Sequence, residues 1–217
     1  MTMNENKSKI LGRTAALVVS TSTFIFGISL VWEMINLSDF AKYLGYIACI
    51  IIAIGVVIMM ACYYDTLQKP LRIFGLLALI SAILYAPLCI GTYYLQLSIV
   101  AFNPLESSRD VIQAINFKPG SPTFAVDMLG YTFLCLSTLA AGFGIIETKD
   151  KVLRILCLFH GALAIPTIAS PIISGLFLSS SGETDFTGHF VLLFWCAVFT
   201  PIALLFMKYF RKTYPEK

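Results

Sequence analysis

The stretch YLGYIACIIIAIGVVIMMACYY, residues 43–64, lies between Lys42 and Asp65 and contains no charged side chain. A helix needs about 20 predominantly apolar residues to cross the hydrocarbon core of a bilayer. The apolar residues do not alternate with polar ones, as they would in a half-buried strand, and they cover all sides of a helix. Inside a bilayer each backbone polar group must be satisfied within its own segment, which a helix achieves. The stretch therefore predicts a transmembrane helix.

Five further apolar runs occur along the chain, each bounded by charged residues. Together the runs predict transmembrane helices over residues 14–32, 43–64, 73–97, 128–146, 153–178 and 190–208. The composition agrees, because 58% of the residues are hydrophobic and only 12% are charged, whereas about 25% are charged in an ordinary soluble domain. The prediction is an all-α integral membrane protein, a six-transmembrane-helix bundle in one membrane domain over residues 1–217.

Positive charge is divided unequally between the two sides of the predicted bundle. The side with both termini holds Lys7, Lys9, Arg13, Lys69, Arg72, Lys149, Lys151, Arg154, Lys208, Arg211, Lys212 and Lys217, whereas the other side holds only Lys42, Arg109 and Lys118. Short cytoplasmic loops carry the excess of lysine and arginine. We therefore expect both termini in the cytoplasm and the bundle in the plasma membrane. The unequal division of charge behind the net charge of +3 is a topology signal, so the expected surroundings are membrane lipid and not nucleic acid.

The outer connection between the third and fourth spans, residues 98–126, is longer than the others. It contains Asn103-Pro104-Leu105-Glu106, which is typical of a helix start, and Lys118-Pro119-Gly120, which ends a helix. The pattern between them predicts a short amphipathic helix. Two interpretations stay open: a surface helix that ties the third span to the fourth, or a lid over a binding site.

His160 lies in the fifth span, six residues from Arg154, which corresponds to a depth of about 9 Å in a helix. Ser81, Thr138 and Thr200 lie at similar depths in other spans. A buried histidine needs partners for both ring nitrogens, and these hydroxyl groups could supply them. The histidine is either an interhelical hydrogen-bond clamp or a titrating, ligand-binding group.

Small and polar residues recur at helical spacing in four of the spans. The columns are His160, Ala164, Thr167, Pro171 and Ser174; Asp127, Tyr131, Cys135, Thr138 and Gly142; Ser81, Tyr85, Cys89 and Thr92; and His189, Cys196 and Thr200. Such columns either pack tightly or line a polar cavity. Pro166 and Pro171 each remove a backbone donor, so we expect a kink in the fifth span and free carbonyl groups, which favour a cavity.

The leading hypothesis is a protein that binds, and could transport, a small neutral or amphipathic molecule in a cavity between spans three to six, without a cofactor. The candidate ligand-binding residues are His160, Thr167, Tyr85, Tyr131, Asp127, Thr138 and Ser81. The first alternative is a non-catalytic sensor, immunity or accessory subunit whose polar columns pack together and whose partner is another protein or a second copy of the chain.

The second alternative is a metal-dependent membrane enzyme with Glu183, Asp185 and His189 as candidate ligands, since oxygen ligands and one imidazole suit zinc. The common catalytic motifs are absent, so a non-enzymatic protein is expected. The middle of each predicted span lacks aspartate, glutamate, lysine and arginine, which argues against a carboxylate-based antiporter and a charge-lined channel. All six cysteines lie within spans, so extracellular disulfides are not expected.

Overall fold

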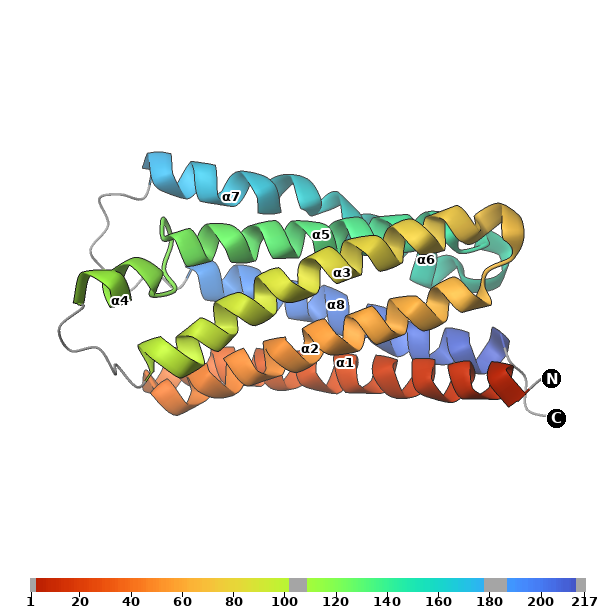
Figure 1. Cartoon of the computed structure of the whole chain (residues 1–217), viewed down its shortest axis with the longest axis horizontal. Helices are drawn as coiled ribbons and strands as arrows, with labels where there is room; N and C mark the ends of the chain where they lie inside the picture. Colours follow the sequence, from red (N-terminus) through yellow and green to blue (C-terminus); the bar gives the residue numbers. More distant parts are fainter. Residues whose placement is uncertain (1–2, 102–108, 178–186, 214–217) are drawn as a thin grey trace.

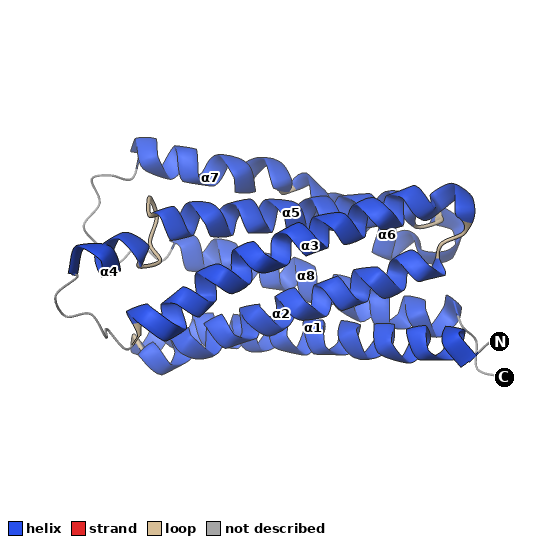
Figure 2. Cartoon of the chain, viewed as in Figure 1, coloured by secondary structure: helices blue, strands red, loops and turns tan. Residues whose placement is uncertain are grey.

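The computed structural model describes residues 3–101, 109–177 and 187–213, and within these residues the regular elements are helices (Figure 2). The elements are α1 (Met3–Asn36), α2 (Asp39–Thr66), η1 (Lys69–Leu71), α3 (Arg72–Leu95), η2 (Gln96–Val100), α4 (Arg109–Ile115), α5 (Pro122–Gly144), α6 (Glu147–Ala162), α7 (Ala164–Phe177) and α8 (Thr187–Thr213). η1 is a turn of 3-10 helix before α3, and η2 is a π-helical turn after it.

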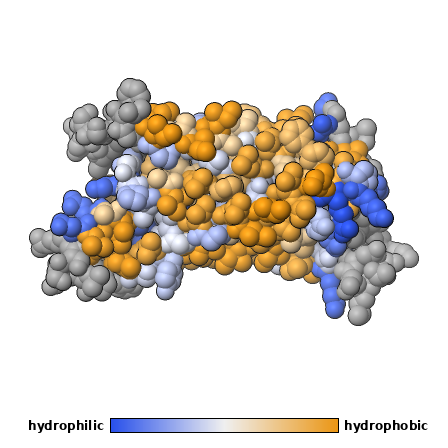
Figure 3. All heavy atoms as spheres, turned by 45° about the horizontal axis from the view of Figure 1, so that its top comes forward, coloured by the Kyte–Doolittle hydropathy of each residue, from blue (hydrophilic) through white to orange (hydrophobic). Residues whose placement is uncertain are grey.

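Six helical stretches are long and apolar enough to cross a membrane. They are Lys7–Asn36, Asp39–Thr66, Lys69–Val100, Pro122–Gly144, Asp150–Ile173 and Gly188–Lys212. A broad band of hydrophobic side chains covers the middle of the molecule, and hydrophilic side chains gather toward its two ends (Figure 3). The prediction of an all-helical protein with six helices of membrane-spanning length is thus confirmed for the described residues.

The helices form a ring in which neighbours along the chain are mostly neighbours in space. α1 packs against α2 and α8, α3 packs against α2 and α5, and α6 joins α5 to α8. Both termini lie at one end of the bundle, which we call the terminal end (Figure 1). α4 lies at the opposite end, the α4 end. The ring places residues of α2, α3, α5, α6 and α8 in one buried interior.

α5 begins earlier than the sequence predicts. The predicted span starts at residue 128, after the charged Asp127, whereas the helix starts at Pro122 with Ser121 as its cap. The hydroxyl of Ser121 accepts a hydrogen bond from the backbone N–H of Phe124 at 3.2 Å, which satisfies one of the free donors of the first turn. Asp127 therefore lies inside the helix and not at its boundary.

The fifth span is broken, as its prolines predict. α6 ends at Ala162 and α7 begins at Ala164, so Leu163 lies at the break. Because Pro166 has no N–H to donate to the carbonyl of Ala162, the regular ladder is interrupted at this point. Beyond the break α7 packs mainly against α5 and leaves the ring, with Ile165 75% and Ile172 66% exposed.

The connection between α3 and α5 contains the short helix α4, in the region where the sequence predicts one. The predicted helix start at residues 103–106 lies outside the described residues. Within α4, Ile112 is partly buried and Val111 is exposed. After α4 the chain turns back across the end of α3 and α5 and reaches Ser121.

Candidate functional site

A group of polar side chains is buried between α2, α3 and α5 near the α4 end. We call it the carboxyl cluster: Cys49 of α2, Cys89 and Tyr93 of α3, and Asp127 and Tyr131 of α5. The hydroxyl of Tyr93 donates to Oδ2 of Asp127 at 2.9 Å and lies 3.3 Å from the hydroxyl of Tyr131. The Tyr131 hydroxyl lies 3.9 Å from the sulfur of Cys49. All five residues are buried.

The hydrogen bonds of the carboxyl cluster have one direction. A tyrosine hydroxyl has a single proton to donate, and that of Tyr93 is used on Asp127. The bond between the two tyrosines must therefore run from Tyr131 to Tyr93, and Cys49 is left as the donor to Tyr131. Each group donates toward the next, and the series ends on one oxygen of Asp127.

The second oxygen of Asp127 has no partner. Its side chain is 1% exposed, and Oδ1 is a buried atom without a hydrogen bond. The ion pairs found among the described residues do not include Asp127. A buried polar atom without a partner costs about 1–3 kcal/mol and calls for an explanation such as a water, an ion or a ligand. Asp127 is thus an incompletely satisfied acid inside the bundle.

Aromatic rings pack around the two tyrosines of the carboxyl cluster. Tyr46 stacks on Tyr93 with 5.4 Å between ring centroids, and Phe117 lies 6.2 Å from Tyr93. Tyr85 lies 6.1 Å from Tyr131, and Trp195 of α8 meets Tyr131 edge to face at 5.2 Å. The rings are in contact with one another, so the carboxyl cluster is closed in this structure.

The chain between α4 and α5 covers the cluster at the α4 end, and Gln96 holds it in place. The side-chain amide of Gln96 donates to the carbonyl of Ile115 at 2.8 Å and accepts from the backbone N–H of Phe117 at 3.0 Å. Thr123 donates to the same carbonyl of Ile115 at 3.0 Å. These bonds keep the ring of Phe117 against Tyr93.

A second polar group, the histidine cluster, lies farther from the α4 end than the carboxyl cluster and joins three helices. It consists of Thr138 of α5, His160 of α6 and Trp195 of α8. The indole Nε1 of Trp195 donates to Nε2 of His160 at 3.0 Å, and Nδ1 of His160 lies 2.7 Å from the hydroxyl of Thr138. Because an indole can only donate, Nε2 is the acceptor, and Nδ1 of the neutral ring carries the proton that Thr138 accepts.

The histidine cluster is complete. The hydroxyl of Thr138 donates a hydrogen bond to the carbonyl of Cys135 at 2.9 Å, so every donor of the cluster has an acceptor. His160 is 0% exposed, and its ring also packs on Phe199 with 5.1 Å between centroids. This is the geometry of an interhelical clamp. The ring of Trp195 joins the two clusters by touching Tyr131, and the hydrogen bonds of the described residues do not connect them.

The structure brings together most, but not all, of the candidate residues. Asp127, Tyr131 and Tyr85 meet around the carboxyl cluster, whereas His160 and Thr138 bond to each other. Ser81 is partly exposed on α3, and the hydroxyl of Thr167 donates to the carbonyl of Leu163 in its own chain segment at 2.6 Å. Neither shares a hydrogen bond with His160 in the described part of the chain.

Sequence reasoning missed Tyr93, Phe117 and the hydrogen-bonding role of Trp195. Tyr93 lies near the predicted outer end of the third span, where tyrosine is common because it favours the membrane–water interface. Its position therefore gave no reason to assign it to a site. A signal was nevertheless present, because Tyr93 follows Cys89 by four residues and so shares its helix face.

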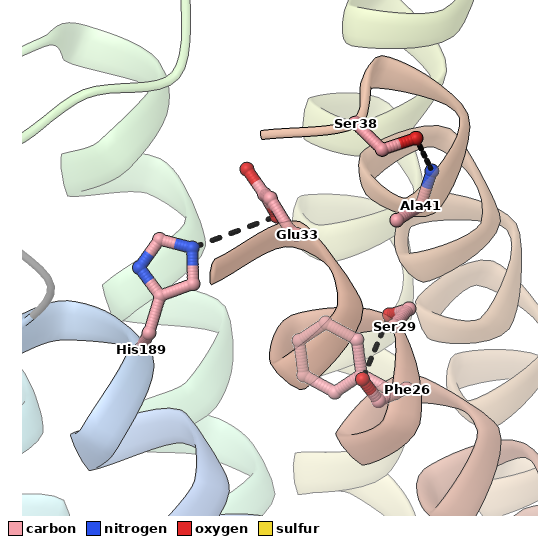
Figure 4. A network of polar contacts seen from close by, with 6 residues as sticks. All are labelled: Phe26, Ser29, Glu33, Ser38, Ala41 and His189. Atoms are coloured by element: carbon pink, nitrogen blue, oxygen red, sulfur yellow. Dashed lines mark hydrogen bonds and ion pairs between the residues drawn. The ribbon is translucent and has the colours of Figure 1, made fainter. Parts of the chain in front are cut away.

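The candidate metal ligands are not assembled in the described residues. Glu183 and Asp185 lie outside those residues. His189 of α8 points toward Glu33 of α1, with 3.5 Å between Nε2 and Oε2 and 24% of each side chain exposed (Figure 4). Groups of three or more metal-ligating side chains are absent from the part of the chain that the structure describes.

Two hollows lie elsewhere in the molecule. A groove of about 730 Å³ runs between α1 and α8 and is lined mostly by apolar side chains, among them Phe24, Ile28 and Leu193. A cavity of about 470 Å³ lies at the terminal end beside the ion pair of Lys212 with Asp150, whose atoms are 2.6 Å apart. Neither hollow is lined by the candidate ligand-binding residues.

Comparison with models of known protein families, with curated proteins and with solved structures found no match to this chain.

Proposed function

We propose that this protein is a membrane-embedded receptor or carrier that binds a small amphipathic molecule at the carboxyl cluster. The observation that supports the proposal is the buried Oδ1 of Asp127, which lacks a partner. A ligand with a hydrogen-bond donor would satisfy this oxygen, and the surrounding rings of Tyr46, Tyr85 and Tyr131 would contact its apolar part. Asp127 and Tyr131 are the proposed ligand contacts.

The contrast between the two clusters supports placing the ligand at Asp127 and not at His160. In the histidine cluster both ring nitrogens of His160, the indole N–H of Trp195 and the hydroxyl of Thr138 each have a hydrogen-bond partner. These bonds account for the presence of the polar side chains. The carboxyl cluster lies under a short covering segment, and Asp127 keeps an unused acceptor. We assign His160 and Thr138 to holding the helices together.

Replacement of Asp127 by asparagine tests the proposal. Asparagine keeps the acceptor for Tyr93 and exchanges one unpaired atom for another, so we expect the free energy of unfolding to change by less than about 1 kcal/mol. A panel of aromatic alcohols, amides and amines is screened by thermal shift on the purified full chain. Compounds that stabilise the unchanged protein are expected to lose their effect on Asp127→Asn.

The matched control is Thr132→Val, which alters a buried hydroxyl on the same helix outside the carboxyl cluster. It is expected to keep every ligand-induced shift. A panel in which each stabilising compound acts equally on Asp127→Asn and on the unchanged protein would remove Asp127 from the site.

The proposal includes a topology, with both termini in the cytoplasm and the α4 end outside the plasma membrane. The bias of lysine and arginine toward the terminal end supports it. The ligand would then reach the carboxyl cluster from outside.

Cysteine labelling tests this topology with little background, because all six native cysteines are buried. Lys118 and Lys69 are exposed and lie on opposite predicted sides. A membrane-impermeant maleimide is expected to label Lys118→Cys in intact cells, and Lys69→Cys only after the membrane is opened. Labelling of Lys69→Cys alone in intact cells would invert the topology.

A further inference from the structure

The carboxyl cluster holds one acid and no base. The titratable side chains placed around Asp127 are Tyr46 and Cys49 of α2, Tyr85, Cys89 and Tyr93 of α3, and Tyr131 of α5. None of these groups carries a positive charge in any protonation state. Among the described residues, lysine, arginine and histidine form no ion pair with Asp127. The positive partner that an ionised Asp127 requires must come from elsewhere.

We infer that the ligand is a small organic cation whose ammonium group binds Oδ1 of Asp127 among the rings of Tyr46, Tyr93 and Tyr131, and that its binding releases the proton of the carboxyl group. The inference rests on the proposed function, and it adds the ligand's charge and the exchange of a proton. Aromatic rings attract an ammonium group at their faces by about 0.5–2 kcal/mol each when water is excluded. Cages of aromatic rings bind ammonium ligands in this way, and a carboxylate adds a charge-assisted hydrogen bond.

The proton follows from the burial of the carboxyl group. An isolated ionised carboxylate is very costly in an apolar interior and takes up a proton instead. Without a ligand, Asp127 is therefore a neutral acid. Because Oδ2 accepts from Tyr93, the proton is on Oδ1, and this group lacks a partner. When the ammonium group arrives, the O–H bond of the acid breaks, the proton leaves to water, and the carboxylate pairs with the cation. One proton is exchanged for one cation, so the charge inside the cluster is unchanged.

The burial of Asp127 leaves room for carboxylate chemistry that the sequence-based argument disfavours. That argument depends on acidic residues being at the span boundaries. In the structure Asp127 lies in α5, five residues after its first residue Pro122, and is 1% exposed. It thus has the environment that is typical of ion-exchanging carboxyl groups within membranes.

The ligand needs a path to the acid, and the covering segment offers one. Phe117 packs against Tyr93, and the segment that follows contains Gly120 at φ +84°, where a Cβ atom would meet nothing within 4 Å. The ring of a benzyl amine resembles that of Phe117 in size and shape. We therefore expect such a ligand to take the place of the Phe117 ring, with its ammonium group directed toward Asp127.

Benzylamine and benzyl alcohol form a matched pair of probes, since they share a ring and a donor and differ in charge. Binding is measured by calorimetry on the purified full chain at constant chloride, in two buffers with different heats of ionisation, so that proton release is counted. We expect benzylamine to bind, to release one proton, and to bind about tenfold more tightly per pH unit as long as the ligand-free acid stays protonated, as linkage requires. Benzyl alcohol is expected to bind at least about tenfold more weakly.

Two variants sharpen the test. Phe117→Ala leaves room for the ring of the probe and is expected to tighten benzylamine binding several-fold. Phe124→Ala removes a ring that touches Phe117, at 5.8 Å between centroids, without belonging to the carboxyl cluster. It is expected to leave the affinity within about twofold.

The outcomes separate the inference from the proposed function. If benzyl alcohol bound as tightly as benzylamine and both lost affinity in Asp127→Asn, the ligand's positive charge would be overturned while the site would stand. If sodium ions at matched ionic strength occupied the site as tightly as benzylamine does, the ligand would be an inorganic cation and the inference of an organic one would be overturned. No benzylamine binding, even to Phe117→Ala, or binding without proton release, would also overturn the inference. Benzylamine binding that Asp127→Asn does not weaken would overturn the site itself.

Discussion

Gly161→Ala is expected to destabilise the bundle by about 2–3 kcal/mol, near the upper part of the range for overpacked cores. A Cβ atom on Gly161 of α6 would lie 2.5 Å from Cβ and 2.8 Å from Cα of Leu139 in α5. The Cα atom belongs to the backbone, so the contact is relieved only if the two helices separate. Their separation would also stretch the neighbouring bond between Thr138 and His160, which is 2.7 Å long. The measurement is thermal unfolding in detergent, followed by circular dichroism.

Gly91→Ala is the matched control for this glycine. It lies in α3, and a Cβ atom there would meet nothing within 4 Å. Alanine has a higher helix propensity than glycine by about 1 kcal/mol, so we expect Gly91→Ala to be neutral or slightly stabilising. Equal destabilisation by the two substitutions would show that the approach of α5 and α6 does not depend on Gly161.

His160→Ala is expected to cost about 3 kcal/mol. The substitution removes a fully buried ring and leaves a cavity, and it leaves the indole donor of Trp195 without an acceptor. His160→Phe separates these causes, because phenylalanine fills most of the space but accepts no hydrogen bond. We expect it to cost about half as much as alanine does, again by thermal unfolding.

Ligand binding distinguishes a clamp from a binding residue at position 160. If His160 only holds α5, α6 and α8 together, His160→Phe that folds will bind benzylamine within about twofold of the unchanged protein. His189→Gln, at a partly exposed position of α8, is the control for loss of an imidazole. Loss of binding in folded His160→Phe, with the control unaffected, would return His160 to the ligand site.

The number and type of the spans could be predicted from sequence because a bilayer imposes a length and excludes charge. The same rule misplaced Asp127. Charged residues served as span boundaries, yet the true start of α5 is set by the cap of Ser121 and by Pro122. A single acid one turn and a half into a helix is indistinguishable from a boundary residue until its neighbours are known.

The depth of His160 along its span pointed to Thr138 as a hydrogen-bond partner, but it did not point to the second partner, Trp195. Thr138, Ser81 and Thr200 lie at similar heights, and only Thr138 bonds to the histidine among the described residues. Height along the membrane normal follows from the rise of the helix, whereas the direction in which a side chain points depends on how each helix is rotated and packed. The same missing information hid Trp195, whose indole reaches His160 from α8.

Trp195 has a position with a practical consequence. Its ring touches Tyr131 of the carboxyl cluster, and its Nε1 bonds His160 of the histidine cluster. The chain has two tryptophans, and the other, Trp32, lines the groove between α1 and α8. With Trp32 changed to phenylalanine, the fluorescence of a single native indole would report on both clusters at once. Occupancy of one and integrity of the other could then be followed optically, without an added label.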